Sequence, residues 1–416
     1  MKKVLLVLTL VVGLTALAAC GNDSDEETEH AQGVLEDRIL VGNTAVTTGD
    51  LAFVGAPFVA GMEAYFNMIN EDGGVLGRNI ELVHESDGFD GEQGNTITQS
   101  MVEEDEVFAM VGHFGTPTVG ATDEYLTTIG MPRVYYGTGT SLVYNEEATE
   151  LGERASFPVQ PVYEFEGELM VARAVDEFDA QKIGLLYTGN ENGNEIRTGM
   201  LAMADDLGVE VVDVLASTDD MEAEALSLVN EDVDVIVLGM NQWSAISGVT
   251  ALLTAGNTVP TIVSYVAADT SFSDYVYAAL PSFDIYANAW VDLLDTDGSP
   301  SDGYLTYVEE ISKDHPEYEN NSFAIAGWIA AMIFVEGLNK LDPDEAITWE
   351  AYIEAMEDGT LEYDLGADLD YQNGKRTGTQ ILSLLQMHYD ADEEATYFDT
   401  VAPMEHIDDI VSRIEE

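Results

Sequence analysis

The sequence predicts an α/β protein made of two lobes, each built around a parallel-rich sheet. Its 416 residues, 46% of them apolar, exceed one domain of ordinary size and can bury a large core. From Ile39 onward, short β-branched runs alternate with helical patterns, which is typical of parallel strands joined by crossover helices. A second series of the same units begins after Pro158 and predicts the second lobe.

The first lobe is expected to begin near Arg38. A helix over 56–70 carries an apolar stripe with helical spacing, so that it would pack on the sheet. The stripe consists of Val59, Met62, Phe66 and Ile69. Apolar, β-branched runs predict strands at 39–42, 80–83 and 107–111.

The second lobe is predicted from similar runs at 182–187, 209–214, 233–238 and 261–264. After about residue 281 the pattern becomes helical, and late strands are expected at 380–387 and 396–401. A chain that ends in this way is expected to return to each lobe in turn. The predicted boundaries are 38–158 with about 285–377 for the first lobe, 159–284 with about 378–402 for the second, and 403–416 for a C-terminal helix.

The amino terminus has the pattern of an export signal over residues 1–19. Two lysines precede an apolar run that is too short to span a bilayer, so a permanent membrane helix is the weaker alternative. The small residues before Cys20, the only cysteine, resemble a bacterial lipobox. Cys20 is therefore predicted to carry lipid and to anchor the mature protein to the membrane, and 20–37 to form an acidic tether.

The charge balance is the most unusual feature of the composition. Lys and Arg number 14 against 79 Asp and Glu, which gives a net charge of −65. Coulomb repulsion excludes nucleic acid and makes an anionic membrane surface an implausible partner. Molar salt shortens the screening length to about 3 Å, so the composition indicates a saline or alkaline habitat.

Four segments, taken in order, resemble one known family. They are GGVLGR at 73–78 with IELV at 80–83, VGHFGTPT at 111–118, GMP at 130–132 with YYGTGT at 135–140, and NGKRTG at 373–378. This series resembles the branched-chain amino-acid (Leu/Ile/Val-type) substrate-binding proteins of ABC transporters, which are often lipoproteins. The resemblance implies the type I periplasmic-binding-protein fold, with two Rossmann-like lobes joined by a multi-strand hinge.

The resemblance also implies a function and a location. The protein is expected to be an extracytoplasmic lipoprotein on the outer face of the cell membrane. It would close its lobes on a small polar solute, such as an amino acid or an amide, and pass that solute to an ABC permease. No cofactor, metal or catalytic residue is expected.

Ligand-binding residues are expected in the loops that follow the strands, because ligands of open α/β sheets bind there. From the first lobe, Phe53 stands where the family places an aromatic ring, with core packing as the alternative. Thr116 can cap a helix or bind a ligand carboxylate at the positive helix end. Gly137 lets the backbone approach a ligand, and Thr138 and Thr140 present hydroxyls.

In the second lobe the matching positions are Tyr163, Asn192, Asn241 and Tyr265. Trp243 can line the same cleft or pack under its helix. Amino-acid binders of this family often carry a Glu near the position of Tyr265, and this chain has none there. Asp269 is a possible substitute, and the solute remains open among amino acids, amides, urea-like compounds and organic carboxylates.

Other chemistry is poorly supported. The six histidines form no His-x-x-x-His pair, and the acidic turn at 295–298 lacks the remaining ligands of a calcium loop, so a solvated turn is expected. No complete phosphate loop, dinucleotide fingerprint or nucleophile elbow is found. A ligand-sensing receptor module with the same fold is the main alternative, and a hydrolase using two of the many carboxylates is a weaker one.

Overall fold

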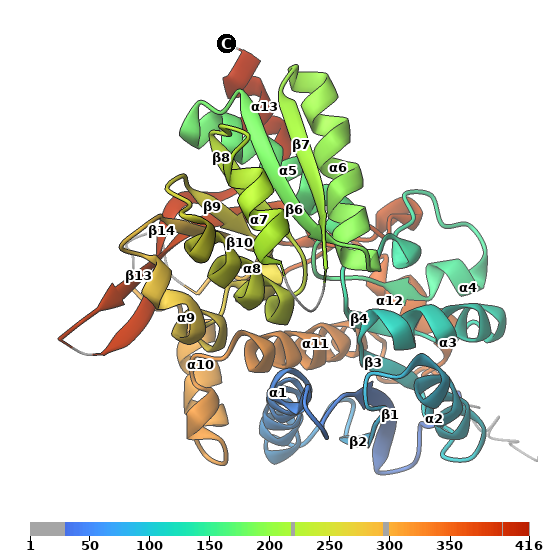
Figure 1. The fold of residues 1–416 in the computed structure, drawn as a ribbon. Coiled ribbons are helices and arrows are strands. Elements are labelled where there is room, and N and C mark those ends of the chain that lie inside the picture. Colours follow the sequence, from blue (N-terminus) through green and yellow to red (C-terminus); the bar gives the residue numbers. More distant parts are fainter. Residues whose placement is uncertain (1–29, 218–220, 294–298, 393, 416) are drawn as a thin grey trace, which may run out of the picture.

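The computed structural model describes residues 30–217, 221–293, 299–392 and 394–415, and it contains two main sheets. In Figure 1 the lobe around the first sheet lies below and the lobe around the second lies above. The predicted export signal, Cys20 and the turn at 295–298 lie outside the described residues. The predicted α/β class with two parallel-rich sheets is confirmed.

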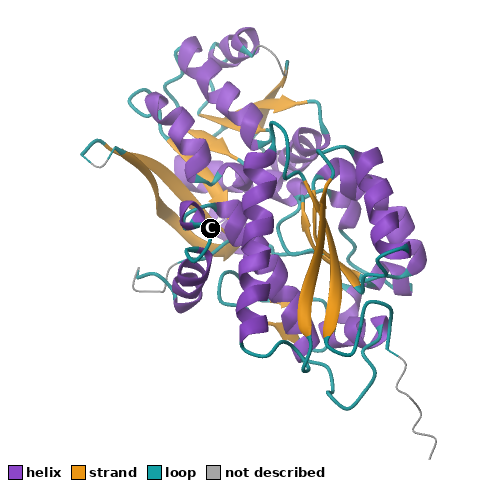
Figure 2. Cartoon of the chain, turned by 90° about the horizontal axis from the view of Figure 1, so that it is seen from below, coloured by secondary structure: helices purple, strands orange, loops and turns teal. Residues whose placement is uncertain are grey.

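The first sheet has five strands in the order β2-β1-β3-β4-β5, and all of its neighbours are parallel. Every residue of β3 is buried, as expected for a parallel strand covered by helices on both faces. Figure 2 shows helices on both sides of these strands. The strands are β1 (Arg38–Ala45), β2 (Asn79–Ser86), β3 (Ala109–Phe114), β4 (Arg133–Gly137) and β5 (Ser156–Phe157).

The second sheet has seven strands in the order β14-β13-β10-β9-β8-β6-β7. Strands β6 to β10 pair in parallel, and the late hairpin β13–β14 adds two antiparallel strands at one edge. The strands are β6 (Lys182–Thr188), β7 (Glu210–Ala216), β8 (Val235–Gly239), β9 (Thr261–Val263), β10 (Ile285–Ala289), β13 (Ile381–Asp390) and β14 (Ala395–His406). A small antiparallel pair is formed by β11 (Thr360–Leu361) and β12 (Leu369–Asp370).

The α-helices of the first lobe are α1 (Ala52–Glu71), α2 (Gly91–Glu103), α3 (Thr116–Ile129), α4 (Leu151–Arg154), α10 (Asp302–Ile311), α11 (Ser322–Asn339) and α12 (Trp349–Met356). Those of the second lobe are α5 (Tyr163–Phe178), α6 (Glu191–Leu207), α7 (Glu222–Val229), α8 (Gln242–Ala255), α9 (Thr270–Val276) and α13 (Ile407–Glu415). The predicted stripe on α1 faces the core, since Val59, Met62 and Phe66 are buried.

Glycines let the long helices of each lobe pack closely. A Cβ on Gly61 of α1 would lie 1.9 Å from the carbonyl oxygen of Ala324, and one on Gly327 of α11 would lie 1.8 Å from that of Phe58. Gly167 of α5 and Gly199 of α6 allow the same close approach between these two helices, because a Cβ on either would lie 2.1 Å or 1.8 Å from a carbonyl oxygen of the other helix. Both α1 and α11 are long and apolar enough to cross a membrane, but here they pack against each other in the first lobe.

Three structural boundaries differ from the predicted ones. Strand β10 belongs to the second sheet, so the chain leaves that sheet after Ala289 rather than at about residue 285. Its sequence is rich in Ala and Asn, which have weak strand propensity, so neighbouring strands rather than local preference determine it. At the carboxyl end β14 runs to His406, and the last helix begins at Ile407 rather than at 403.

Residues 30–37, predicted to be part of a tether, pack instead on the first lobe. The Gln32 side chain donates to the carbonyl oxygens of Val102 and Val107, and Val34 is buried. The described fold therefore includes residues before Arg38.

The chain passes between the two sheets three times, after β5, after β10 and before β13. The first and third connections lie side by side, because the Thr379 amide donates to the Val159 carbonyl oxygen at 2.8 Å. Connecting segments that lie side by side between two lobes are the geometry expected of a hinge.

Candidate functional site

A cavity of about 300 Å³ lies between the two lobes and is lined by residues of both. This volume is at the small end of the range for small-molecule sites. The cavity lies at the carboxyl ends of the parallel strands, where open α/β sheets bind ligands.

Six helices begin at this cavity, because residues at the starts of α1, α3, α5, α6, α8 and α11 line it. The amino terminus of a helix carries a partial positive charge and free N–H groups. No Lys or Arg lines the cavity within the described part of the chain, and Glu191 is the only acidic side chain that does. The partial positive charge at the site therefore comes from these helix starts.

The wall from the first lobe is aromatic. The ring of Phe58 lies 5.1 Å from that of Phe114 and 5.7 Å from that of Tyr135, measured between centroids. Phe323, at the start of α11, adds a ring 6.5 Å from Phe114. Phe89 extends this surface from the loop after β2.

Two glycines make room for these rings. A Cβ on Gly137 would lie 2.3 Å from the ring of Phe114, and one on Gly115 would lie 2.9 Å from the ring of Phe89. Gly115 also has a φ of 93°, which favours glycine. The glycines at the ends of β3 and β4 therefore shape the aromatic wall.

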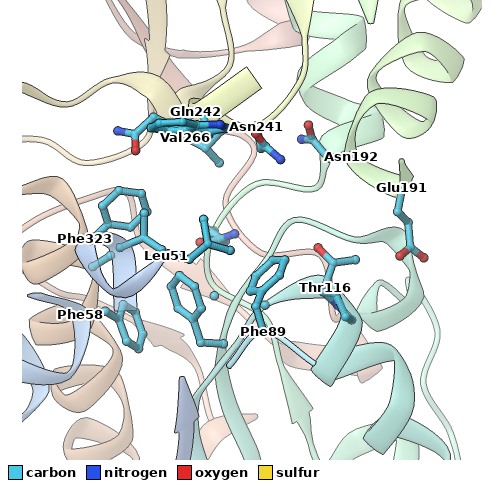
Figure 3. A pocket seen from close by; sticks show the side chains of 18 of the residues that line it. Leu51, Phe58, Phe89, Thr116, Glu191, Asn192, Asn241, Gln242, Val266 and Phe323 are labelled. Atoms are coloured by element: carbon cyan, nitrogen blue, oxygen red, sulfur yellow. The ribbon is translucent and has the colours of Figure 1, made fainter. Parts of the chain in front are cut away.

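The wall from the second lobe carries side-chain amides. Asn192 is 6% exposed, and neither of its amide atoms has a hydrogen-bond partner among the described residues. Gln242 is 4% exposed; its Nε2 donates to Ser271, while its Oε1 has no partner in the described chain. Asn241 caps α8 by accepting from the Ser244 amide at 3.0 Å. Figure 3 shows these amides opposite Phe58, Phe89 and Thr116.

Contacts between the lobes surround the cavity. The rings of Phe53 and Trp243 lie 6.3 Å apart across its mouth. Glu195 of α6 accepts from the Ser141 hydroxyl at 2.8 Å and from the Thr140 hydroxyl at 3.2 Å, both in the turn that follows β4. These contacts join the two lobes, so they depend on the angle between them.

A buried carboxyl group lies behind the cavity. Glu166 of α5 is fully buried and accepts from the Ser264 hydroxyl and the Tyr265 amide, each at 2.7 Å, and from Asn288 at 3.3 Å. Burial raises its pKa to about 7, although these hydrogen bonds partly offset the effect. Its oxygens are engaged, and it does not line the cavity.

The structure brings most of the predicted site residues to the cavity. Those that line it are Phe53, Thr116, Gly137, Tyr163, Asn192 and Asn241, and Trp243 does so as well.

Thr138, Thr140 and Tyr265 do not line the cavity, and their hydroxyls bond to other protein groups. The hydroxyl of Thr138 lies 2.7 Å from that of Thr116, and the hydroxyl of Thr140 binds Glu195. The Tyr265 hydroxyl accepts from Gln160 and donates to the Pro161 carbonyl oxygen, both at 3.0 Å.

Asp269, the suggested partner for an ammonium group, is also engaged elsewhere. Its carboxylate accepts from the amide of Ser271 at 2.7 Å and from that of Ser322 at 2.6 Å, at the starts of α9 and α11. It does not line the cavity.

The cavity residues that sequence reasoning missed include Phe89, Gln242 and Phe323. Phe89 follows β2 directly, so the strand-end rule applied to the other loops would have found it. Gln242 is adjacent to two residues that were predicted. Phe323 lies in the first turn of a helix whose apolar sequence indicates burial in the core. Nothing in that sequence shows that the first turn lines a cavity.

The fold and this cavity define a class of two-lobed α/β proteins that bind a small molecule between their lobes. Residues 38–392 match the periplasmic binding protein family, and the chain belongs to that family.

Relatives of known structure share this fold. The fatty acid ABC transporter substrate-binding protein from Thermomonospora curvata has a TM-score of 0.76 at 21% identity, covering 91% of this chain and 95% of that one. A branched chain amino acid ABC transporter from Thermus thermophilus with bound valine has a TM-score of 0.75 at 16% identity, covering 89% of this chain and 97% of that one.

A sequence relative matches over a shorter stretch. The "Amino acid binding protein" of Pseudomonas aeruginosa is 24% identical over 174 residues, which span 42% of this chain and less than half, 45%, of that protein.

Proposed function

We propose that this protein is the extracytoplasmic solute-binding component of an ABC importer and has no catalytic role. The observation that carries the proposal is the cavity whose two walls belong to different lobes. A solute that touches both walls is bound fully only when the lobes are closed, so it shifts the population toward the closed form. A permease can distinguish that form from the open one.

The relatives support a transport role and leave the solute open. Their names specify a fatty acid in one case and valine or an unspecified amino acid in the others. A cavity that accepts an apolar side chain or a short acyl chain is compatible with both kinds of solute.

A thermal-shift screen of amino acids, amides, ureas and short carboxylates tests this proposal. A compound that binds only the folded protein raises the melting temperature, and at 100 times its Kd it adds about 2.7 kcal/mol of stability. The same compound is expected to reduce the radius of gyration in small-angle scattering. A screen in which no compound raises the melting temperature would contradict a solute-binding role.

A variant pair shows whether the hit binds in the cavity. Val266 lines the cavity, whereas Val401 is an exposed valine of β14 that does not. Val266→Trp should fill the cavity and remove the thermal shift, and Val401→Trp should leave it unchanged.

We further propose that lipid on Cys20 anchors the protein to the outer face of the membrane. The small residues before this cysteine and the apolar run of the leader support the assignment. Wild-type protein should sediment with membranes, while Cys20→Ala should be exported but remain in the soluble fraction. Continued sedimentation of Cys20→Ala would exclude this anchor.

We also propose adaptation to high salt. Arg133, Arg173 and Arg376 are fully buried, and the last two form ion pairs with Glu405 and Glu357. Since these cations lie inside, they screen little of the acidic surface. The melting temperature should therefore rise with NaCl concentration, and a melting temperature independent of salt would contradict the proposal.

A further inference from the structure

Two side-chain amides of the second-lobe wall are buried with an incomplete set of hydrogen bonds. Asn192 and Gln242 are both more than nine-tenths buried and line the cavity. The atoms without a partner in the described structure are Oδ1 and Nδ2 of Asn192 and Oε1 of Gln242. The two oxygens accept hydrogen bonds and Nδ2 donates them, so the site lacks two donors and one acceptor.

The two amides lie on neighbouring helix starts. Strands β6 and β8 pair in parallel, and each is followed by its helix, α6 or α8. A Cβ on Gly193 of α6 would lie 2.7 Å from the carbonyl oxygen of Gly239, the last residue of β8. Figure 3 shows both amides on the second-lobe side of one cavity, so a single ligand can face both of them.

A carboxylate does not complete these bonds. It offers acceptors only, so it could bind Nδ2 of Asn192 but would leave both amide oxygens without a donor. It would also bring its own negative oxygens toward theirs. No Lys or Arg lines the cavity within the described residues to offset this repulsion. An anionic head group is therefore a poor match for the amides.

An ammonium group is a poor match for a different reason. It offers donors only, and it would be buried near helix starts that carry partial positive charge. Glu191 is the only acid that lines the cavity in the described chain, and it is solvent-exposed. Glu166 and Asp269 already bind protein groups. The carboxylate of an amino acid could bind Nδ2, but its ammonium would still be buried without an opposite charge, which is costly.

A neutral carboxamide supplies the complete missing set. Its NH₂ group carries two donors and its carbonyl oxygen is an acceptor. Because one N–H of a primary amide lies beside the C=O, this edge can pair with the Asn192 amide through two hydrogen bonds. The other N–H is the donor that Oε1 of Gln242 lacks. A single hydroxyl has one donor and would leave one of the amide oxygens unpartnered.

The rest of the cavity favours an apolar body on this head group. Phe58, Phe89 and Phe323 face the amides, and Val266 and the ring of Trp243 extend the apolar surface to the second lobe. A sugar or another polyol would bury hydroxyls against these rings without partners. A hydrocarbon chain or ring has no such cost.

Resting on the proposed solute-binding function, we infer that the solute is a neutral, apolar compound with an unsubstituted carboxamide group. The carboxamide pairs with Asn192 and donates to Gln242. The hydrocarbon lies on the phenylalanine wall. Charged head groups of either sign are disfavoured because each leaves buried atoms of the amides unpartnered or is itself buried without an opposite charge.

Three compounds with the same carbon skeleton test the neutral character of the head group by calorimetry on the full chain. They are isocaproamide, isocaproate, which is an anion, and leucine, which is a zwitterion. Isocaproamide should bind more tightly than either of the others by about tenfold or more, and tenfold corresponds to about 1.4 kcal/mol. An affinity for isocaproate or leucine equal to or above that for isocaproamide would overturn the inference.

A fourth compound tests whether the N–H donors are used. N,N-Dimethylisocaproamide keeps the neutral carbonyl group and the hydrocarbon but has no N–H. It should bind at least about tenfold more weakly than isocaproamide, because both amide oxygens then stay unpartnered. Equal binding of the two amides would show that the pairing with Asn192 does not form.

A matched pair of substitutions on α6 locates the head group. Asn192→Asp replaces the donor at the cavity by a charged acceptor, whereas Asn194→Asp adds the same charge on the exposed side of the helix. Asn192→Asp should weaken isocaproamide by about tenfold or more and strengthen 4-methylpentylamine, the corresponding amine, by a similar factor. Asn194→Asp should change either affinity by less than about twofold. Equal effects of the two variants would contradict the assigned position.

The inference and the function on which it rests fail in different ways. Preference for leucine or isocaproate removes the carboxamide assignment but leaves a solute-binding protein. Lack of binding by all of these compounds also removes the assignment, whereas the proposed function is contradicted only if the whole thermal-shift screen gives no hit.

Discussion

The first lobe faces the cavity with rings that pack on one another, whereas the second lobe faces it with amides that leave three polar atoms without partners in the described structure. Phe58, Phe114 and Tyr135 belong to the core of the first lobe as much as to the cavity. Asn192 and Gln242 are buried at a cost that nothing in the described chain offsets. The aromatic wall can therefore contribute to both stability and binding. The burial of the amides is explained only if a ligand supplies their missing hydrogen bonds.

The largest expected effect comes from breaking the aromatic wall. Phe58 is fully buried, so Phe58→Ala should lower the free energy of unfolding by about 3–5 kcal/mol, measured by urea denaturation. Phe53 lines the same cavity but is 38% exposed, and Phe53→Ala should cost less than about 1 kcal/mol. Similar losses in the two variants would show that the wall is not part of the core.

The next effect concerns the carboxyl group behind the amide wall. The pKa of Glu166 is raised to about 7 in the folded protein, from 4.5. Between these values the folded protein keeps a proton that the unfolded chain has lost, so the contribution is present at low pH and is lost as pH rises. The loss amounts to about 3 kcal/mol, at 1.36 kcal/mol per unit.

The test compares the wild type with Glu166→Gln, since the other acids titrate equally in both. The difference in unfolding free energy between the two proteins should change across pH 4.5 to 7, with the wild type losing stability relative to the variant. A constant difference over this range would contradict the raised pKa.

A smaller change in the free energy of unfolding, opposite in sign to that of Phe58→Ala, is expected in the amide wall. Asn192→Leu removes two buried polar atoms that have no partner in the described structure, so it should stabilise the ligand-free protein by about 1–3 kcal/mol. The same change should abolish ligand binding. Destabilisation by this substitution would mean that Asn192 has a structural role that the site does not require.

The smallest effect is expected at the contact between the lobes. Glu195→Gln weakens the bonds to Thr140 and Ser141, and a loss of about 1 kcal/mol would shift the balance toward the open form by about fivefold. Small-angle scattering without ligand should then give a larger radius of gyration than the wild type. Glu191→Gln, one helical turn away, removes the same charge and should leave the radius unchanged.

The sequence predicts the fold well where local patterns and topology agree. The stripe on α1 and the alternation of strands and helices need no distant information. Strand β10 was not predicted, because its pairing with β9 and β13 determines it more than its own residues do.

The position of the site, like the fold, is predicted where local pattern and topology agree. Thr116, Asn192 and Asn241 each follow a strand and line the cavity, because the topology brings the strand ends to one edge of each sheet. The sequence cannot show how side chains compete for partners. Tyr265 therefore turns to Gln160 and Pro161, and Thr140 turns to Glu195.

Fluorescence of Trp243 tests the central claim, binding between the lobes, most directly. Trp243 is 57% exposed at the cavity mouth, where Phe53 of the other lobe lies 6.3 Å away, while Trp290 and Trp328 are buried. A bound solute and closed lobes should remove water from this indole and shift its emission to the blue, and Trp243→Phe should abolish the shift. Solute binding seen by calorimetry with no change in Trp243 emission would contradict binding in this cavity.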